Sequence, residues 1–290
     1  MSTAIIPSPP TLATLSIEVE DEIRTLALNR PDSLNAMSPE MIGELTVAAG
    51  WLADQAPLRG LIVTGAGDRA FSAGGDVNWF RGGLDDPDLD LPSDVRRGAD
   101  VLHQAIVDFR RIPYPVIGAI NGVAAGAGFS LALMCDLRIA SAEAAFVCAY
   151  GRIGASPDGG MTYFLPRVVG PARALELLLE DPLLSADRAL ELGLVSEVVA
   201  AEELHEAARA KAEYLAEKAP HYVRMAKQLV GQSLDNTLAD HLQLERHGIA
   251  DSMATEDLRE GVTAFFEGRE AKFTGGGAPN RVRHPEERTW

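Results

Sequence analysis

The sequence has little cysteine, no long hydrophobic run and few basic residues, and each shortage excludes a class of protein. Its two cysteines, Cys135 and Cys148, both lie in apolar surroundings, so buried free thiols are expected and a disulfide-built secreted scaffold is excluded. Without a CxxC pair or a histidine-rich cluster, no metal site is predicted. No apolar run approaches the ~20 residues of a membrane span, and the start "MSTAIIPSPP" lacks the features of a signal peptide. A cytoplasmic protein without a membrane partner is therefore expected.

The shortage of basic residues also excludes a nucleic-acid partner. The sequence has 42 acidic residues and only 26 lysines and arginines, which gives a formal net charge of −16. Nucleic acids are held by clustered positive charge, which this balance does not provide. A small anionic ligand remains possible, because a few local cations or helix N-termini suffice for it.

Strand and helix patterns alternate to about residue 199, which predicts an α/β core. "LSIEVEDEIRTLALN" predicts a β-hairpin, Ser38 is expected to cap a helix, and the acidic segment 81–92 is expected to be a long exposed loop before a helix capped by Ser93. Four helix-like segments without strand pattern follow the core. We therefore expect a flexible tail over 1–12, the core over 13–200, a helical region over 201–273 and a second flexible tail over 274–290.

Three glycine-bearing turns are candidates for chemistry: "AFSAGGD" (70–76), "NGVAAGAGFS" (121–130) and "PDGG" (157–160). Backbone N–H groups at such turns lack partners and can hold an anion or a developing oxyanion. Each turn alone could equally be a tight turn that needs glycine. A dinucleotide fingerprint in "VTGAGDRA" is rejected, because a second glycine turn follows where a helix should open.

The order of these motifs, followed by "LSADRALELGLVSEVV", closely resembles the crotonase (enoyl-CoA hydratase/isomerase) superfamily over roughly residues 14–273. The resemblance implies a spiral of ββα units with a helical C-terminal region that builds homotrimers, often paired into homohexamers. It also implies an acyl-CoA thioester as substrate, with coenzyme A part of that substrate and no separate cofactor.

The resemblance places two backbone N–H donors for a thioester enolate at Ala73, in "SAGG", and Ala127, in "AGAG". Donors already in place for developing charge contribute several kcal/mol, about 3–4 for one donor in protease oxyanion holes. Small side chains are required at these positions, because the backbone N–H groups must reach the thioester oxygen. The remaining substrate-contact positions implied in these two turns are Gly74, Gly75, Asp76 and Gly126, of which Asp76 corresponds to a residue that orders its loop.

Both acid/base glutamates of typical hydratases are absent. Ser130 stands at the first of these positions and Tyr150 at the second. Serine is a poor base, and tyrosine, with an ordinary pKa of about 10, is mostly protonated near neutrality. Ser130 could contact substrate or hydrogen-bond back to its own helix, and Tyr150 could donate to substrate or to Asp158, or only pack.

Asp158, in "SPDGG", occupies a position where typical hydratases carry glycine and some isomerases of the superfamily carry a catalytic aspartate. One carboxylate facing C2 and C4 of a β,γ-enoyl thioester can move a proton between them. The alternative is that Asp158 only caps the helix that begins near Gly160. His103, on an amphipathic helix, is expected to be structural.

For coenzyme A, "RPDSLNAM" resembles the segment whose backbone lies along the adenine, which implies contacts from Ser33, Asn35 and Ala36. Arg269 and Lys272 are candidates for its phosphates, because Gly268 stands where some hydratases have lysine.

Three hypotheses remain open. The first is an enoyl-CoA isomerase that uses Asp158 with the Ala73 and Ala127 N–H groups. The second is a hydratase (a lyase) in which Ser130, Tyr150 and Asp158 position water. The third is a non-catalytic oligomer that binds CoA thioesters, which any turnover dependent on Asp158 would exclude.

Overall fold

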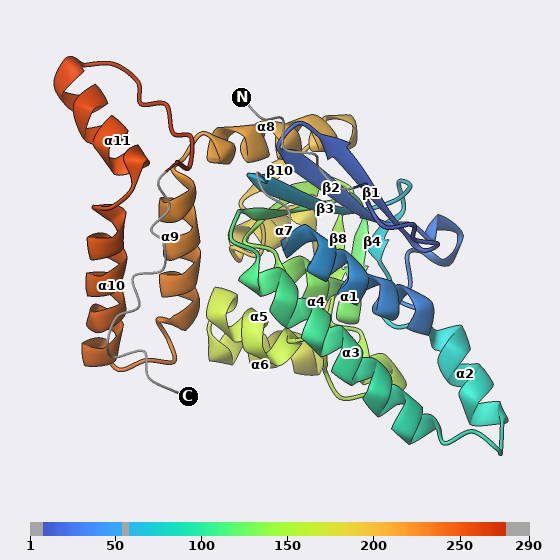
Figure 1. The fold of residues 1–290 in the computed structure, drawn as a ribbon. Helices are drawn as coiled ribbons and strands as arrows, with labels where there is room; N and C mark the ends of the chain where they lie inside the picture. Colours follow the sequence, from blue (N-terminus) through green and yellow to red (C-terminus); the bar gives the residue numbers. More distant parts are fainter. Residues whose placement is uncertain (1–7, 54–57, 277–290) are drawn as a thin grey trace. The chain divides into compact units, whose positions relative to one another are not determined.

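The structure, a computed structural model, describes residues 8–53 and 58–276 (Figure 1). The two predicted tail segments, 1–12 and 274–290, lie mostly outside these residues. The chain forms two compact units, Met1–Ala212 and Glu213–Trp290. In the described residues, none of the helices combines the length and the apolar character that crossing a membrane requires.

The first unit is built on two sheets, and the mixed α/β class predicted from the sequence is confirmed. The six-stranded sheet has the order β1-β2-β3-β5-β7-β10 and the four-stranded sheet the order β4-β6-β8-β9. The predicted hairpin is present as antiparallel β1 and β2, and the neighbours from β2 to β10 in the larger sheet are parallel. The strands are β1 Leu15–Glu20, β2 Ile23–Leu28, β3 Gly60–Gly65, β4 Ala70–Ser72, β5 Val116–Ile120, β6 Val123–Ala125, β7 Leu137–Ser141, β8 Ala145–Val147, β9 Leu184–Ser185 and β10 Glu197–Val199.

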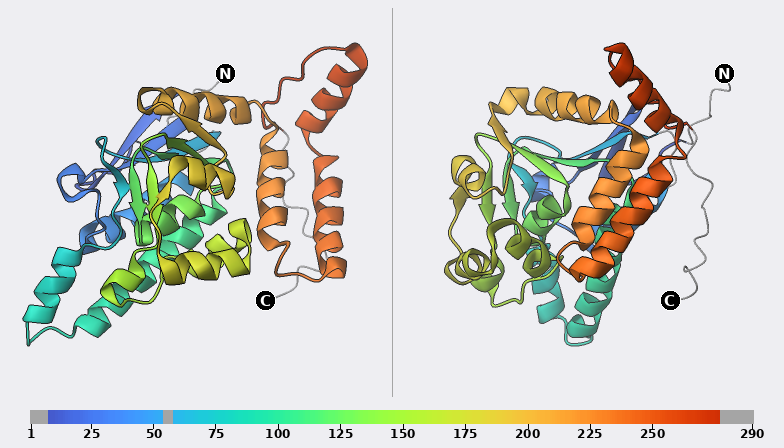
Figure 2. Two further views of the ribbon diagram at one scale, coloured as in Figure 1. Left: turned by 180° about the vertical axis from the view of Figure 1, so that it is seen from behind. Right: turned by 90° about the vertical axis from the view of Figure 1, so that its left-hand side faces the viewer.

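Helices pack against these sheets and against one another. In Figures 1 and 2, α1 lies alongside α3, and α5 and α6 lie together beside α4. Ser38 caps α1 as predicted, since its Oγ accepts the N–H of Met41 at 3.2 Å. Cys135 and Cys148 are buried free thiols, as expected. The helices are α1 Pro39–Ala53, α2 Val77–Asp85, α3 Leu91–Arg111, α4 Ala127–Met134, α5 Met161–Val169, α6 Pro171–Glu180, α7 Ala186–Glu191 and α8 Leu204–Ala216, within which the unit boundary falls.

The prediction of a long loop over 81–92 is wrong. Residues 81–85 belong to α2, and α3 already begins at Leu91. Aspartates cap both helices: Asp76 accepts the N–H of Asn78, and Asp90, not Ser93, caps α3 by accepting the N–H of Ser93. Pro92 stands in the first turn of α3, where its missing N–H costs nothing. Local capping thus outweighs the loop-like glycine, proline and acidic composition.

The second unit is helical in its described residues, as the sequence predicts. After the end of α8 it contains α9 Pro220–Gln232, α10 Leu238–Ser252 and α11 Glu256–Glu267. Helices α9 and α10 run side by side (Figure 2), with Gly248 of α10 facing the flexible end of the Met225 side chain on α9.

Candidate functional site

Three neighbouring strands of the smaller sheet bring three of the predicted site residues to one edge. Strand β6 lies between β4 and β8 and is parallel to both. The carboxyl ends of parallel neighbours share one edge of a sheet, so the segments that follow them meet there. Ala73 follows β4, Ala127 follows β6 and opens α4, and Tyr150 follows β8 and opens a short 3₁₀ helix, Tyr150–Ile153.

The first two glycine turns touch one another. A Cβ on Gly74 would lie 2.6 Å from the Ala125 carbonyl oxygen and 3.1 Å from the Ala127 nitrogen. One on Gly128 would lie 2.3 Å from the Ser72 carbonyl oxygen. Glycine is therefore required at this junction by close backbone approach, and at Gly74 also by a φ of +87°.

The two candidate oxyanion donors differ in what they already bind. Ala127 is the first residue of α4, so its N–H has no partner within that helix, and it lies at the positive end of the helix dipole. The N–H of Ala73 donates to the carbonyl oxygen of Leu34 at 2.9 Å. The Ala127 N–H is available to a ligand as it stands, whereas the Ala73 N–H would have to share or exchange its Leu34 partner.

Ser130, Tyr150 and Asp158 form one hydrogen-bonded network, which the structure brings together from α4, the 3₁₀ helix and the turn before α5. The Tyr150 hydroxyl donates to Oδ1 of Asp158 at 2.8 Å. Ser130 Oγ donates to the Asp158 carbonyl at 3.0 Å, and the two hydroxyl oxygens lie 3.1 Å apart. Ser130 also lies 3.4 Å from the Gly126 carbonyl, so its bond within its own helix is the longest that it makes.

Burial decides the protonation of the tyrosine. Burial, and then the neighbouring Asp158 carboxylate, raise the pKa of Tyr150 far above its usual value. The phenol therefore stays protonated over the physiological range, where it is a hydrogen-bond donor and not a base.

The hypothesis that Asp158 only caps a helix is wrong. Helix α5 begins at Met161, its N-cap is Gly160 with a φ of +82°, and no side chain caps it. The Asp158 carboxylate instead bonds Tyr150 through Oδ1, while Oδ2 has no hydrogen-bond partner in the described part of the chain. One carboxylate oxygen is thus held and the other is available.

Asn35 and Asp76 brace the first turn. The Asn35 side chain is fully buried and donates to the carbonyls of Ala66 and Ala70 at 3.0 and 2.8 Å. Asp76 caps α2 and pairs with Arg30 at 3.0 Å. Their side chains are therefore engaged within the protein. Of the other adenine-segment positions, Ser33 is exposed and Ala36 is buried.

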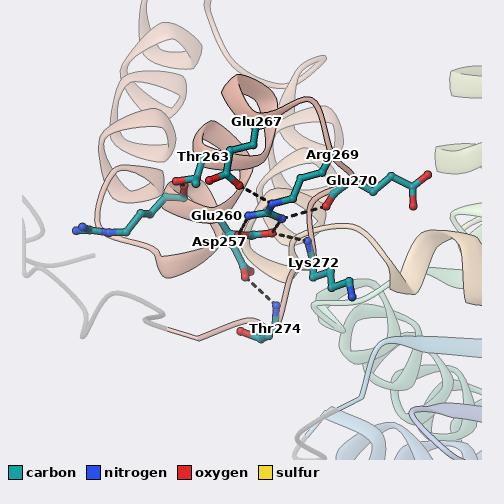
Figure 3. Close-up of polar contacts among 9 residues, drawn as sticks. Asp257, Glu260, Thr263, Glu267, Arg269, Glu270, Lys272 and Thr274 are labelled. Atoms are coloured by element: carbon teal, nitrogen blue, oxygen red, sulfur yellow. Dashed lines mark hydrogen bonds and ion pairs between the residues drawn. The ribbon is translucent and has the colours of Figure 1, made fainter.

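The cationic residues predicted for the CoA phosphates lie after α11 and are shown in Figure 3. Arg269 forms a two-pronged ion pair with Glu260, at 2.6 and 2.9 Å, and a third bond with Glu267 at 2.7 Å. Its charge is therefore already matched by two carboxylates, against which a phosphate would have to compete. The backbone N–H of Lys272 donates to Glu260, whereas its ammonium group points away from this cluster.

The Arg269 contact predicts a low titration midpoint for Glu260. Hydrogen bonds from Arg269, followed by that from the Lys272 N–H, lower the pKa of Glu260 to about 2. Because this pKa is depressed in the folded state, the stabilising contact is complete above the ordinary glutamate pKa of about 4.3 and is lost as the pH falls through about 2. Carboxylate ¹³C NMR should show this midpoint in the wild type and a return toward about 4.3 in Arg269→Gln. An unchanged midpoint in the variant would contradict the assigned cause.

Two further residues reach the network, and the sequence marked neither as functional. His103 on α3 accepts the N–H of Gly159 through Nε2 at 3.2 Å. Asp181, after α6, accepts the N–H of Ala149 at 2.8 Å and pairs with Arg152 at 2.7 Å. It thereby holds Ala149 at a φ of +63°, immediately before Tyr150. No local sequence signal distinguishes either residue.

Comparison with known proteins agrees with this arrangement. Residues 18–276 match the family model described as "Enoyl-CoA hydratase/isomerase". A 1,2-epoxyphenylacetyl-CoA isomerase of Escherichia coli K12 is 40% identical over 257 residues, which cover 89% of this chain and 97% of that protein. A crotonyl-CoA hydratase of Syntrophomonas wolfei is 34% identical over 260 residues, covering 89% and 96%.

Solved structures agree as well. An enoyl-CoA hydratase from Bacillus anthracis superposes with a TM-score of 0.84 at 33% identity, covering 91% of this chain and 100% of that one. An enoyl-CoA hydratase from Polaromonas sp. JS666 gives 0.84 at 33% identity, covering 90% and 99%. The crotonase fold expected from the sequence motifs is confirmed.

Proposed function

The chain belongs to the enoyl-CoA hydratase/isomerase family, and on that premise we propose that it is an enoyl-CoA isomerase in which Asp158 moves one proton between two carbons of the acyl chain. The observation that carries the proposal is the composition of the hydrogen-bonded network at the edge of the smaller sheet. Among the three side chains bonded to one another there, Asp158 is the carboxylate and Ser130 and Tyr150 are hydroxyls, whereas the Asp181 carboxylate bonds the Ala149 backbone beside them.

One carboxylate suffices for isomerisation. Oδ2 of Asp158 takes a proton from C2 of a 3-enoyl thioester, and the electron pair delocalises over the double bond and the thioester carbonyl as a dienolate. Return of the proton to C4 then gives the 2-enoyl thioester, with no atom gained or lost. Hydration needs one group to activate water and another to protonate carbon, and a protonated tyrosine and a serine are poor substitutes for the first.

The dienolate requires donors at the thioester oxygen. We assign these to the N–H groups of Ala127 and Ala73, at the two turns whose backbones touch. The Ala127 N–H is available in the free protein, and the Ala73 N–H exchanges or shares its Leu34 carbonyl when substrate binds. Preorganised backbone donors stabilise charge without reorganisation at the moment of reaction.

Tyr150 and Ser130 hold the proposed base, Asp158, in position. The phenol holds Oδ1, which leaves Oδ2 to face the substrate, and Ser130 holds the backbone carbonyl of the same residue. Tyr150→Phe is therefore expected to lower kcat by about tenfold, the worth of one hydrogen bond, with KM nearly unchanged. Steady-state kinetics beside Tyr163→Phe, a half-exposed tyrosine on α5, checks this. A loss confined to KM would assign Tyr150 to substrate binding instead.

Hydration is the second candidate. Relatives named as hydratases favour it, among them the crotonyl-CoA hydratase of Syntrophomonas wolfei and a probable enoyl-CoA hydratase of Rhodobacter capsulatus at 37% identity. The name of the Escherichia coli relative, a 1,2-epoxyphenylacetyl-CoA isomerase, supports isomerisation as the class of reaction, although the group that it names is an epoxide and not a C=C bond.

For binding and assembly, we propose an acyl-CoA thioester as ligand and a homotrimer or homohexamer as the active form. Lys272 is the better candidate for a CoA phosphate, because Arg269 is already paired with carboxylates. Phe265 and Phe266 on α11 are 80% and 82% exposed, which supports burial of that face in an assembly. Light scattering after gel filtration measures the assembly state.

The proposed reaction is tested by incubating the protein with a panel of 2- and 3-enoyl-CoAs in ¹⁸O-labelled water. Liquid chromatography, which separates these two isomers of equal mass, is expected to show 2-enoyl-CoA formed from a 3-enoyl-CoA, and mass spectrometry is expected to find no ¹⁸O in any product. Incorporation of ¹⁸O into 3-hydroxyacyl-CoA would make the protein a hydratase. If no member of the panel reacts, the isomerase proposal fails, and measurement of CoA-thioester affinity then tests a binding role.

A further inference from the structure

The peptide group that joins Asp158 to Gly159 is held at both of its polar ends. Its carbonyl oxygen accepts from Ser130 Oγ at 3.0 Å and lies 3.1 Å from the Tyr150 hydroxyl. Its N–H lies in the same plane, points the opposite way, and donates to Nε2 of His103 at 3.2 Å. Side chains from α4, the 3₁₀ helix and α3 therefore fix the orientation of one peptide plane.

The surroundings of Gly159 leave this plane little freedom. Gly159 is buried and has a φ of +60°. A Cβ at that position would lie 3.0 Å from Cβ of Ser130 and 3.8 Å from Cδ1 of Ile106. The turn thus lies between α4 and α3, and His103 supplies the polar contact from the α3 side.

His103 is suited to this contact by its place on α3. Its neighbours Leu102 and Ile106 are buried in the core and fix the helix, whereas the imidazole itself is exposed. An N–H donor requires an unprotonated ring nitrogen as acceptor, so the geometry assigns the lone pair to Nε2 and the ring proton to Nδ1. An imidazole in this tautomer can accept the N–H of the turn.

We propose that His103 is a positioning residue for the proton shuttle: by accepting the Gly159 N–H it sets the direction in which the Asp158 side chain leaves the backbone. This inference rests on the function proposed for Asp158. His103 does not touch the substrate in this account. It acts through the peptide plane, and Ser130 and Tyr150 hold the other end of that plane.

The proposal is tested with His103→Leu and His103→Gln. Leucine removes the acceptor, whereas the glutamine side-chain oxygen can reach the same N–H. Gln104→Leu is the matched control, because Gln104 is exposed on the same helix and its side chain bonds Asp108, with no bond to the turn among the described residues. Two quantities are measured for each protein: kcat and KM for a 3-enoyl-CoA, and the hydrogen-exchange rate of the Gly159 amide by NMR.

His103→Leu is expected to lower kcat by about tenfold, the factor that corresponds to one net hydrogen bond, to leave KM nearly unchanged, and to speed exchange at Gly159. His103→Gln should restore most of both properties, and Gln104→Leu should match the wild type. Unchanged exchange in His103→Leu, faster exchange without a change in kcat, or equal losses with leucine and glutamine would each overturn the proposal.

Failure of the proposed function remains distinguishable from failure of this inference. If the wild type converts no 3-enoyl-CoA, the isomerase proposal falls, and the exchange rates alone then decide whether His103 holds the turn. Faster exchange at Gly159 in the leucine variant, restored by glutamine, would support that structural role. Equal exchange in all the proteins would overturn it.

Discussion

Asp158→Asn is expected to lower kcat for isomerisation of a 3-enoyl-CoA by about 10³-fold, within the range that a positioned general base contributes. Asparagine cannot take up a proton, so the variant lacks the group that moves between C2 and C4. It keeps a side-chain oxygen that can accept the Tyr150 hydrogen bond, which should preserve the turn. The loss should therefore appear in kcat with little change in KM or in thermal stability.

Asp187→Asn is the matched control for this variant. Asp187 lies exposed in the first turn of α7 and takes no part in the network. Its substitution should leave turnover at the wild-type level. If Asp158→Asn turned over substrate as fast as this control, Asp158 would not be the base, and the single-carboxylate mechanism would be wrong.

Gly74→Ala is expected to have the second large effect, on stability and activity together. Its φ of +87° disfavours any side chain, at a cost of roughly 1–2 kcal/mol. A new Cβ would also lie 2.6 Å from the Ala125 carbonyl oxygen, a backbone atom that cannot rotate away. We expect the free energy of unfolding to fall by more than about 2 kcal/mol, because overpacking adds to the backbone strain.

The same substitution should impair the oxyanion donors. The added Cβ would lie 3.1 Å from the Ala127 nitrogen, so relief of the clash separates the two turns. Loss of one well-placed donor costs about 10²–10³-fold in kcat. Gly82→Ala, in α2 with nothing within 4 Å of its added Cβ, should retain activity and stability. A Gly74→Ala protein as stable and active as this control would mean that close contact between the two glycine turns is not required. Chemical denaturation and steady-state kinetics measure both effects.

The parts of the fold that depend on local patterns could be predicted from the sequence. Alternation of apolar and polar residues gave the β1–β2 hairpin, and Ser38 caps α1 as its place before Pro39 indicates. The acidic, glycine- and proline-rich segment 81–92 predicts an exposed loop, but Asp76 before it caps α2 and Asp90 within it caps α3. A cap and a loop use the same residue types, and only the backbone distinguishes them.

The candidate site could be predicted as a set of residues but not as a network. Motif order singled out Asp158, Tyr150 and Ser130. That the phenol donates to the carboxylate depends on the backbone before Tyr150, which Asp181 holds from 32 positions away. Contacts of this kind are set by tertiary packing and cannot be predicted from the spacing of residues along the sequence. Arg269 illustrates the converse, since its charge suggested a phosphate ligand and the structure pairs it with Glu260.

The most direct test of the single-carboxylate mechanism is isomerisation of a 3-enoyl-CoA in D₂O, with the label located by NMR in reactions of the wild type and Asp158→Asn. The account predicts that the wild type forms 2-enoyl-CoA without adding water, with deuterium only at C2 and C4, to which a protonated Asp158 carboxyl returns deuterium after exchange with solvent, and that the variant forms product about 10³-fold more slowly. Deuterium at these carbons in the variant at the wild-type rate, or water added across the double bond by the wild type, would contradict it.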